Sequence, residues 1–439
     1  MKVVRGSPFG FDNAKISRTL VIQAPGRLNL IGEHTDYNGG KVLPFCIDRS
    51  VQIRINVIDN GSDLVRVIAE NIGEALEVRK SELPVTVEQL PDQRWTHYVL
   101  GALSLAFARE VKIAGEIRVS ISADLPLGAG LSSSAALCTG LLAGFAKLFG
   151  YDWSRDEIAL LAQRVEHEYA GTKCGLMDQL AILYGESETL LKVDFARTDK
   201  PYGFALEKVV AHPHFNDYEV LVFNSNVAHA LATSEYNVRR AECDELVKRL
   251  NLKFGKAWSN ITEVGEAKVL GAHFDVAAPF SDLKDQVKEV ANIIGGEVSR
   301  AITLAQRALH VISENLRLAA AVDAIRSGDL FTLHILLNNA HDSLAQLYQV
   351  SCPEIEALRF DILELAENIK TSFRDQPLII GPRMCGGGFG GSLISLVCKD
   401  FVHSFTERFN ASDKYKKQYG FVPTCFVAQI SNGLTVHEL

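Results

Sequence analysis

Short β-branched stretches alternate with longer amphipathic stretches along the first half of the chain, which predicts strands interleaved with helices. These stretches predict strands over residues 20–24, 51–57, 64–69 and 116–123, and helices over 95–109, 133–149 and 155–169. Residues 196–218 show no clear period and contain Pro201, Gly203 and Pro213. Because such residues interrupt regular elements, we expect the chain to cross between two domains here.

The second half of the chain predicts a further mixture of strands and helices. Its patterns predict a strand over residues 219–224, helices over 232–250, 299–327, 329–348 and 354–369, a glycine-rich loop over 381–391 and a strand over 393–398. Residues 251–285 fit neither period. A chain of 439 residues exceeds one ordinary core, so we predict an α+β fold of two lobes, with domains at residues 1–210 and 211–439.

Composition and charge narrow the class of protein. Apolar residues make up 47% of the chain and charged residues 22%, as in folded soluble domains. The formal net charge is −8 and no block of Lys or Arg occurs, so we expect neither nucleic acid nor a membrane as a partner. The best candidate for a membrane span, residues 135–146, is short of the roughly 20 residues required.

The sequence also predicts a cellular location. Residues 1–15 contain no apolar segment typical of a secretory signal. Eight cysteines are scattered singly, with no C-x-x-C pair, which in a chain of this size is typical of reduced thiols. We therefore expect a cytoplasmic protein.

The most informative segment is residues 125–136, Leu-Pro-Leu-Gly-Ala-Gly-Leu-Ser-Ser-Ser-Ala-Ala, which joins a predicted strand to a predicted helix. Such a turn presents free backbone N–H groups and the positive end of the helix, which suits a di- or triphosphate. Other phosphate motifs fit poorly. No Gly-Lys-Ser/Thr occurs, and the G-x-G-x-x-G at Gly386, Gly388 and Gly391 precedes a strand instead of a helix.

Three consecutive hydroxyls follow these glycines, at Ser132, Ser133 and Ser134. They can supply a helix N-cap, an oxygen ligand for Mg²⁺ and a phosphate contact. The plainer alternative is that they only cap a buried helix.

A second dense segment, residues 27–40, reads RLNLIGEHTDYNGG and follows a predicted strand. Its Glu33, His34 and Asp36 can form a metal site, or they can exchange hydrogen bonds with the hydroxyls of a sugar. A solvated turn is the alternative that needs no ligand.

A third segment, residues 165–179, places Glu166 at the end of one helix and Asp178 in the first turn of the next. The positive end of a helix favours the ionised form of an Asp in its first turn. An ordinary Asp at a helix start would look the same.

Together these segments resemble the small-molecule kinase superfamily of galactokinases, homoserine kinases, mevalonate kinases and phosphomevalonate kinases. Within it, the chain resembles galactokinases. GRLNLIGEHTDYNGG at residues 26–40 looks like their sugar signature and LPLGAGLSSSAA like their phosphate loop. CGLMDQ at 174–179 looks like the segment of their catalytic Asp, and RMCGGGFGG at 383–391 like their C-terminal glycine loop. The matches follow the family's order over nearly the whole chain.

The resemblance implies a two-lobed kinase fold with mixed and antiparallel sheets and an active site in the cleft between the lobes. It implies that ATP, with Mg²⁺ as cofactor, phosphorylates the C1 hydroxyl of α-D-galactose to give galactose 1-phosphate and ADP. Asp178 would be the catalytic base, with Arg27 as its charged partner. The sugar-binding residues it implies are Arg27, Glu33, His34, Asp36, Gly175, Asp178 and Tyr236. The ATP-binding residues it implies are Gly128, Ala129, Gly130, Leu131, Ser132, Ser133, Ser134 and Trp95. The Mg²⁺ ligands it implies are Ser134 and Glu166.

The resemblance carries further expectations. Trp95 and Tyr98 would lie near the adenine, and residues 386–388 would support the site from the second domain. The first predicted domain would hold the sugar signature and the phosphate loop. We expect a monomer whose partners are galactose and ATP.

One position departs from the family, because Cys385 stands where galactokinases usually carry a hydroxyl residue, and a thiol is a weaker hydrogen-bonding group. Two rival functions remain. N-acetylgalactosamine and arabinose kinases depart from the HTDYNGG pattern that this chain keeps whole. Galactose sensors without turnover lack residues after the serine triplet, whereas residues 132–136 are intact here.

Overall fold

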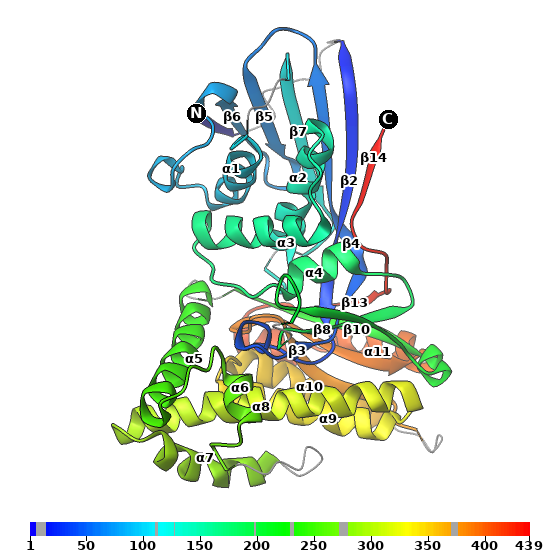
Figure 1. Cartoon of the computed structure of the whole chain (residues 1–439). Coiled ribbons are helices and arrows are strands. Elements are labelled where there is room, and N and C mark those ends of the chain that lie inside the picture. The colour runs from blue at the N-terminus through cyan, green and yellow to red at the C-terminus, as the bar shows by residue number, and fades with distance from the viewer. Residues whose placement is uncertain are drawn as a thin grey trace.

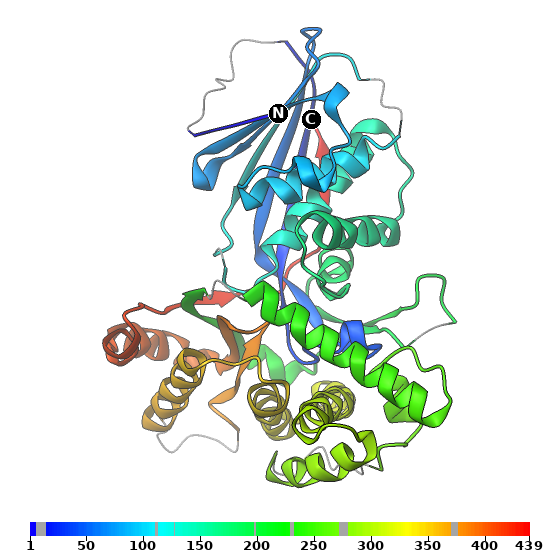
Figure 2. The same ribbon diagram turned by 90° about the vertical axis from the view of Figure 1, so that its left-hand side faces the viewer.

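The computed structural model describes residues 1–5, 15–109, 113–126, 128–196, 199–228, 232–271, 280–369 and 376–439. The chain forms two lobes, one built on a tall twisted sheet and the other on a smaller sheet and a set of long helices (Figure 1). Both chain ends lie in the lobe with the tall sheet (Figure 2). The α+β, two-lobed architecture with mixed and antiparallel sheets confirms the predicted fold class.

The lobe with the tall sheet, which we call the upper lobe, contains a seven-stranded sheet. Its strands, in spatial order, are β1 (Lys2–Arg5), β6 (Glu74–Arg79), β5 (Leu64–Ala69), β7 (Glu116–Ala123), β4 (Pro44–Ile58), β2 (Ile16–Asn29) and β14 (Thr435–Glu438). All neighbours pair antiparallel except β5 and β7, which are parallel. The side chains of Leu20, Ile22 and Ala24 alternate along β2 and are fully buried, as expected for a strand with one covered face.

Four helices pack in this lobe: α1 (Arg94–Ala106), α2 (Ser133–Phe149), α3 (Arg155–Arg164) and α4 (Met177–Tyr184). Helices α2 and α4 contact the sheet, and α1 and α3 pack on α2. Helix α2 is apolar on almost every side and contacts β2, β4 and the other three helices. Its burial fixes the position of its N-terminal turn, which is the predicted phosphate-binding turn.

The lower lobe contains an antiparallel sheet in the order β11 (Ile379–Cys385), β12 (Gly390–Cys398), β10 (Tyr218–Ala228) and β13 (Thr424–Ala428). Its helices are α5 (Ala232–Phe254), α6 (Ile261–Glu266), α7 (Phe280–Ile294), α8 (Val298–Ser327), α9 (Leu330–Ser343), α10 (Pro353–Ile369), α11 (Lys399–Ala411) and α12 (Lys414–Tyr419). A small sheet of β3 (Lys41–Val42), β8 (Thr189–Asp194) and β9 (Ala205–Val210) lies where the lobes meet (Figure 1).

Several predicted elements have the observed bounds. The predicted strands at 64–69 and 116–123 and the helix at 133–149 coincide with β5, β7 and α2. The predicted helix over 155–169 is α3 followed by a π-helical turn, Val165–Tyr169. The predicted helix over 329–348 similarly becomes α9 and a second π-helical turn, Leu344–Tyr348.

One prediction was wrong, and two stretches without a predicted element contain regular structure. Residues 381–391 are not one loop, because β11 runs to Cys385 and β12 starts at Gly390, which leaves only a short turn between two buried strands. The stretch 196–218 includes β9, whose pairing with β8 overrides its irregular composition. Of residues 251–285, which fitted no element, the described part holds the end of α5, α6 and the start of α7.

The last strand returns to the first sheet, since β14 pairs with β2 (Figure 1). The residues after β13 therefore complete the upper lobe, although they belong to the second predicted domain. The boundary at residue 210 stays a prediction. Within the part of the chain that the structure describes, no helix is both long and apolar enough to cross a bilayer.

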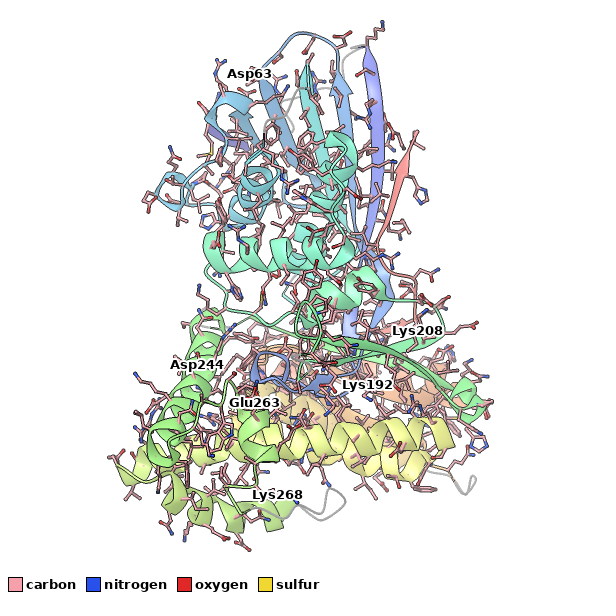
Figure 3. All side chains as sticks on the ribbon, in the orientation of Figure 1. Asp63, Lys192, Lys208, Asp244, Glu263 and Lys268 are labelled. Atoms are coloured by element: carbon pink, nitrogen blue, oxygen red, sulfur yellow. The ribbon has the colours of Figure 1, made fainter. Side chains whose placement is uncertain are left out.

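Charged side chains cover the outside of both lobes. Asp63 at the far end of the upper lobe and Lys268 below the lower helices are exposed (Figure 3). Buried charges are the exception, and Arg27, Glu33 and Glu166 are buried together where the two lobes meet.

Candidate active site

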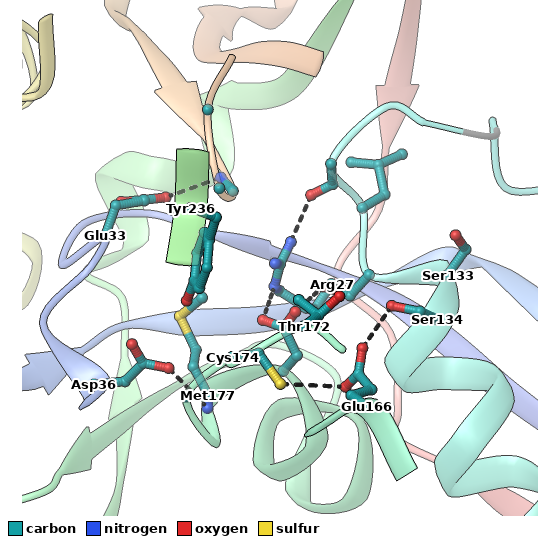
Figure 4. Close-up of a pocket in the computed structure, with 18 of the residues that line it drawn as sticks. Arg27, Glu33, Asp36, Ser133, Ser134, Glu166, Thr172, Cys174, Met177 and Tyr236 are labelled. Atoms are coloured by element: carbon teal, nitrogen blue, oxygen red, sulfur yellow. Dashed lines mark hydrogen bonds and ion pairs between the residues drawn. The ribbon is translucent and has the colours of Figure 1, made fainter. Parts of the chain in front are cut away.

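A pocket of about 310 Å³ lies between the lobes and gathers residues that are far apart in the sequence (Figure 4). Its lining includes most of the predicted site residues: Arg27, Glu33, His34, Asp36, Gly128, Gly130, Leu131, Ser132, Ser133, Ser134, Glu166, Gly175, Asp178 and Tyr236. The structure thus brings the three polar segments to one place.

Two predicted ATP-binding residues are not in this lining. Ala129 is buried, and its carbonyl oxygen accepts a hydrogen bond from Ser392 Oγ at 2.8 Å. The indole N–H of Trp95 donates to Glu74 Oε2 at 2.6 Å, on the side of α1 that meets β6, whereas Tyr98 one turn later does line the pocket. Contact between Trp95 and the adenine stays a prediction.

The predicted catalytic pair forms a close ion pair. Arg27 Nε donates to Asp178 Oδ1 at 2.6 Å, and Arg27 Nη1 donates to the carbonyl oxygen of Gly130 at 2.7 Å. The Arg27 side chain is 4% exposed, so burial disfavours its charge, but Asp178, Cys385 and Glu33 together outweigh burial and raise the pKa of Arg27.

The phosphate-binding turn enters α2 through left-handed residues. Gly128, Gly130 and Ser132 have φ angles of 72°, 74° and 63°. Ser132 occupies the N-cap position, but its hydroxyl makes no capping hydrogen bond and donates to Asp178 Oδ2 at 2.5 Å instead. Of the three serines that could supply an N-cap, Ser132 takes the position without making the capping hydrogen bond. The first N–H groups of α2 have no partner within the helix, as at any helix start.

Glu166 and Ser134 face each other at the same end of the pocket. Ser134 Oγ donates to Glu166 Oε1 at 2.8 Å, and Gln179 Nε2 donates to Glu166 Oε2 at 2.5 Å. Burial and, to a smaller extent, the charge of Asp178 raise the pKa of Glu166 to about 7. A hydroxyl and a carboxylate are oxygen donors of the kind that Mg²⁺ accepts.

Among the described residues, no group of three His, Cys, Asp or Glu side chains is arranged to hold a metal ion. This excludes a cation cage made from three such side chains in the described part of the chain. An ion held by Ser134 and Glu166 would need phosphate or water oxygens as its other ligands, which is the usual way that Mg²⁺ binds with nucleotides.

At the opposite end of the pocket, Asp36 lies against the segment before α4. Asp36 Oδ2 accepts a hydrogen bond from the backbone N–H of Met177 at 3.3 Å. A Cβ atom on Gly175 would overlap the Asp36 carboxylate, so only glycine fits there. Burial and the nearby charge of Asp178 raise the pKa of Asp36 to about 6.

Glu33 is held from the lower lobe. Its carboxylate forms an ion pair with Arg383 of β11 and lies 3.4 Å from the backbone nitrogen of Gly386. Burial raises the pKa of Glu33, while Arg383 opposes that change. The motif RMCGGGFGG contained the signal for this contact, because an Arg inside an otherwise apolar strand requires an acidic or carbonyl partner.

Aromatic rings enclose the remaining wall around His34. Its ring centroid lies 5.3 Å from that of Tyr236 and 4.7 Å from that of Tyr348. Its Nδ1 lies 2.8 Å from the hydroxyl oxygen of Tyr37. Burial holds the pKa of His34 well below its usual value, so the ring is neutral.

The turn between β11 and β12 packs directly on the phosphate-binding turn. A Cβ atom on Gly386 would lie 2.9 Å from the carbonyl oxygen of Gly130, so the two turns can meet only because this position has no side chain. Cys385 is buried behind them, and its sulfur accepts a hydrogen bond from the backbone N–H of Asn29 at 3.3 Å. The thiol at this unusual position is therefore hydrogen-bonded.

The pocket has two chemically different ends with Arg27 between them. Glu33, Asp36 and Tyr236 lie on one side of Arg27, and Ser133, Ser134 and Glu166 lie on the other (Figure 4). One end offers hydrogen-bond acceptors for hydroxyls, and the other offers a helix N-terminus and hard oxygen ligands for phosphate and metal. Three lining residues, Thr172, Cys174 and Met177, were not predicted, because nothing in their residue types indicates a site.

Comparison with known proteins agrees with this geometry. Residues 97–186 match the model of the GHMP kinases N terminal domain, and residues 11–56 match the galactokinase galactose-binding signature. Galactokinase of Thermotoga petrophila is 33% identical over 413 residues, which cover 94% of this chain and 99% of the relative. Galactokinase of Thermotoga maritima is 34% identical over 399 residues, covering 91% and 95%.

The chain belongs to the galactokinase family. The predicted resemblance and the assignment to a phosphotransferase family are thereby confirmed. The crystal structure of Lactococcus lactis galactokinase complexed with galactose is 30% identical, with a TM-score of 0.75 and 95% of each chain covered. The mevalonate kinase of Methanococcus jannaschii, 16% identical with a TM-score of 0.60 over 96% of this chain and 100% of that chain, shares the fold.

Proposed function

We propose that this galactokinase-family chain transfers the γ-phosphoryl group of ATP to the C1 hydroxyl of α-D-galactose, with galactose 1-phosphate and ADP as products. One observation carries the proposal: the Asp178 carboxylate accepts hydrogen bonds from Arg27 and from Ser132 of the phosphate-binding turn, and it lines the same pocket as Glu33 and Asp36. A base at that point faces both reactants at once.

Galactose occupies the end of the pocket that presents carboxylates and aromatic rings. Asp36 and Glu33 accept hydrogen bonds from the sugar hydroxyls, while Gly175 leaves room beside Asp36. His34 and Tyr236 complete this wall of the subsite. A buried polar group left unpaired costs about 1–3 kcal/mol, so an epimer that misplaces one hydroxyl is rejected by roughly 5- to 150-fold.

ATP places its phosphates on the turn from Gly128 to Ser134, against the first N–H groups of α2. Ser134 and Glu166 would hold Mg²⁺, which would neutralise charge on the outer phosphates. The dipole of α2 also stabilises negative charge on the phosphates, and it does so without reorganisation because the helix is already in place.

Asp178 accepts the proton of the C1 hydroxyl as that oxygen bonds to the γ-phosphorus. The bond from the γ-phosphorus to the bridging oxygen breaks and ADP leaves. Arg27 donates a hydrogen bond to this carboxylate and holds it in place. The loose transition state of phosphoryl transfer depends more on positioning than on base strength.

The setting of the enzyme completes the proposal. We place it in the cytoplasm, because all eight cysteines are unpaired in the structure, as in a reducing compartment. We infer that it acts as a monomer on galactose and ATP, since one chain supplies every residue that the mechanism uses.

The decisive assay measures ADP release by the purified chain with Mg²⁺-ATP and galactose, against glucose, N-acetylgalactosamine and arabinose. We expect galactose-dependent release, with kcat/KM for glucose at least about fivefold lower. Equal kcat/KM for galactose and glucose overturns the substrate assignment. Tight galactose binding without ADP release identifies a sensor and overturns the enzymatic proposal.

A further inference from the structure

The three serines at the start of α2 direct their hydroxyls to three different places. Ser134 Oγ donates to Glu166 Oε1 at 2.8 Å. The Ser133 hydroxyl has no hydrogen bond to any described residue and borders the pocket. Ser132 Oγ donates to Asp178 Oδ2 at 2.5 Å, so this hydroxyl gives its proton to a hydrogen bond with the base instead of one with the phosphates.

The backbone of Ser132 makes this contact possible. Its φ and ψ are 63° and 38°, a left-handed conformation that costs a residue other than glycine roughly 1 kcal/mol or more. A serine at an N-cap normally has extended backbone and turns its hydroxyl toward the helix N–H groups. Here the left-handed conformation turns the hydroxyl away from α2 and toward Asp178.

The same turn also accepts hydrogen bonds from Arg27, which is the other partner of the Asp178 carboxylate. The carbonyl oxygen of Gly130 accepts a hydrogen bond from Arg27 Nη1 at 2.7 Å, and that of Leu131 accepts one from the backbone N–H of Arg27 at 3.2 Å. Asp178 Oδ1 accepts a hydrogen bond from Arg27 Nε, and Asp178 Oδ2 accepts one from Ser132 Oγ. These two hydrogen bonds, one on each oxygen, fix the orientation of the carboxylate.

We propose that Ser132 is a positioning residue for Asp178, in addition to its place in the phosphate-binding turn. Each carboxylate oxygen accepts two hydrogen bonds, so Oδ2 can receive the C1 hydroxyl of the sugar while Ser132 holds its other side. The turn that receives the triphosphate thereby also aligns the base. This inference rests on the proposed function.

The test compares Ser132→Ala and Ser132→Gly with Ser133→Ala, the neighbouring serine that does not contact Asp178. We expect both Ser132 variants to lower kcat about 10- to 100-fold while ATP affinity, measured by calorimetry without sugar, stays within about threefold. Ser133→Ala should instead raise the KM for ATP more than it lowers kcat. A Ser132→Ala variant that loses ATP affinity and keeps its kcat overturns the proposal.

The glycine variant separates the hydroxyl from the backbone. Glycine adopts the left-handed conformation freely, so a Ser132→Gly variant with normal kcat would show that only the turn geometry matters, and this would overturn the proposal. Circular dichroism of each variant shows whether it is folded before its rates are compared.

A double-mutant cycle distinguishes most sharply whether Ser132 acts through Asp178 or independently of it. If Ser132 acts through Asp178, adding Ser132→Ala to Asp178→Ala should change the residual rate by less than about twofold. A tenfold further loss would mean that Ser132 acts independently of the base, and would overturn the proposal. Absence of galactose-dependent ADP release in the unaltered chain would instead overturn the proposed function.

Discussion

Replacing Arg383 with methionine should destabilise the protein strongly, because this residue forms an ion pair in the interior. The Arg383 side chain is fully buried on β11 and pairs with Glu33, which is 2% exposed. Its Nη1 also donates to the carbonyl oxygens of Asn29 and Leu30, at 2.9 and 3.0 Å. Methionine fills a similar volume without donors. Among the described residues, the hydrogen bond that then remains to the buried Glu33 carboxylate is the one from the backbone N–H of Gly386, at 3.4 Å.

The expected magnitude follows from the burial of both partners. Removing one member of a buried ion pair typically costs about 3–5 kcal/mol, because the other charge remains buried without compensation. We expect a loss of this size in the free energy of unfolding for Arg383→Met at about pH 8.

The loss should depend on pH in a definite direction. Burial already raises the pKa of Glu33, and removing the cation that opposes this change raises it further. A carboxyl whose pKa is raised in the folded state loses stability as the pH rises through that pKa. The deficit of Arg383→Met should therefore shrink as the pH is lowered and Glu33 takes up a proton.

The assay is urea unfolding followed by tryptophan fluorescence, since the chain contains three tryptophans. Arg326→Met is the matched control, because Arg326 pairs with Glu207 on the surface, where their side chains are 47% and 43% exposed. That variant should lose less than about 1 kcal/mol. In a cycle with Glu33→Gln, the coupling energy should reach about 2 kcal/mol.

A loss for Arg383→Met no larger than that for Arg326→Met would refute the reasoning. So would additive effects of Arg383→Met and Glu33→Gln, since the two side chains would then not depend on each other. A deficit that grows at low pH would contradict the protonation of Glu33.

Three further predictions concern the pocket. Gly175→Ala should raise the KM for galactose at least about tenfold in steady-state kinetics, because its Cβ displaces the Asp36 carboxylate, and an unchanged KM would contradict the placement of the sugar. Since an ionised Asp36 is a stronger hydrogen-bond acceptor for sugar hydroxyls than a protonated one, and burial raises its pKa to about 6, the calorimetric affinity for galactose should fall as the pH drops through that value. Asp36→Asn should bind more weakly but without this pH dependence; an equal dependence in the variant would assign it to another group. Glu166→Gln should raise the Mg²⁺ concentration for half-maximal rate at least about tenfold, and an unaltered Mg²⁺ titration would remove Glu166 as a ligand.

Elements with strong local signals could be predicted from the sequence. Helix α2 has the predicted bounds because its apolar run ends at Gly150, whose left-handed conformation closes the helix. Strands β5 and β7 also match their predicted bounds, since their β-branched residues lie between turn-forming ones.

Elements that depend on distant partners could not be predicted. Strand β11 is buried on both faces, so it lacks the alternation that marks a half-exposed strand, and the glycines that follow it suggested a loop. Strand β14 has four residues and pairs with β2 from the other end of the chain, which no local pattern encodes. The π-helical turns after α3 and α9 also have no signal in hydrophobic periodicity.

The pocket likewise has features that could be predicted from the sequence and features that could not. The residues that meet there were identified through the resemblance of whole motifs, because no periodicity relates Arg27 to Asp178, 151 positions away. The direction in which each of these side chains points could not be predicted in this way. The hydroxyl of Ser132 points to Asp178 only because its backbone is left-handed, and a sequence does not reveal this for a residue other than glycine. Arg383 shows the converse, since a charge within a buried strand could have indicated a partner.

The most direct test of the central claim is the turnover of Asp178→Asn with galactose and Mg²⁺-ATP, measured alongside its affinity for ATP. Asparagine keeps the size of the side chain but removes the charge that Arg27 stabilises and the group that takes the proton. We predict a fall in kcat of about 10²- to 10⁴-fold, with ATP affinity within about threefold of the unaltered chain. A kcat close to that of the unaltered chain would contradict the role of Asp178 as the base.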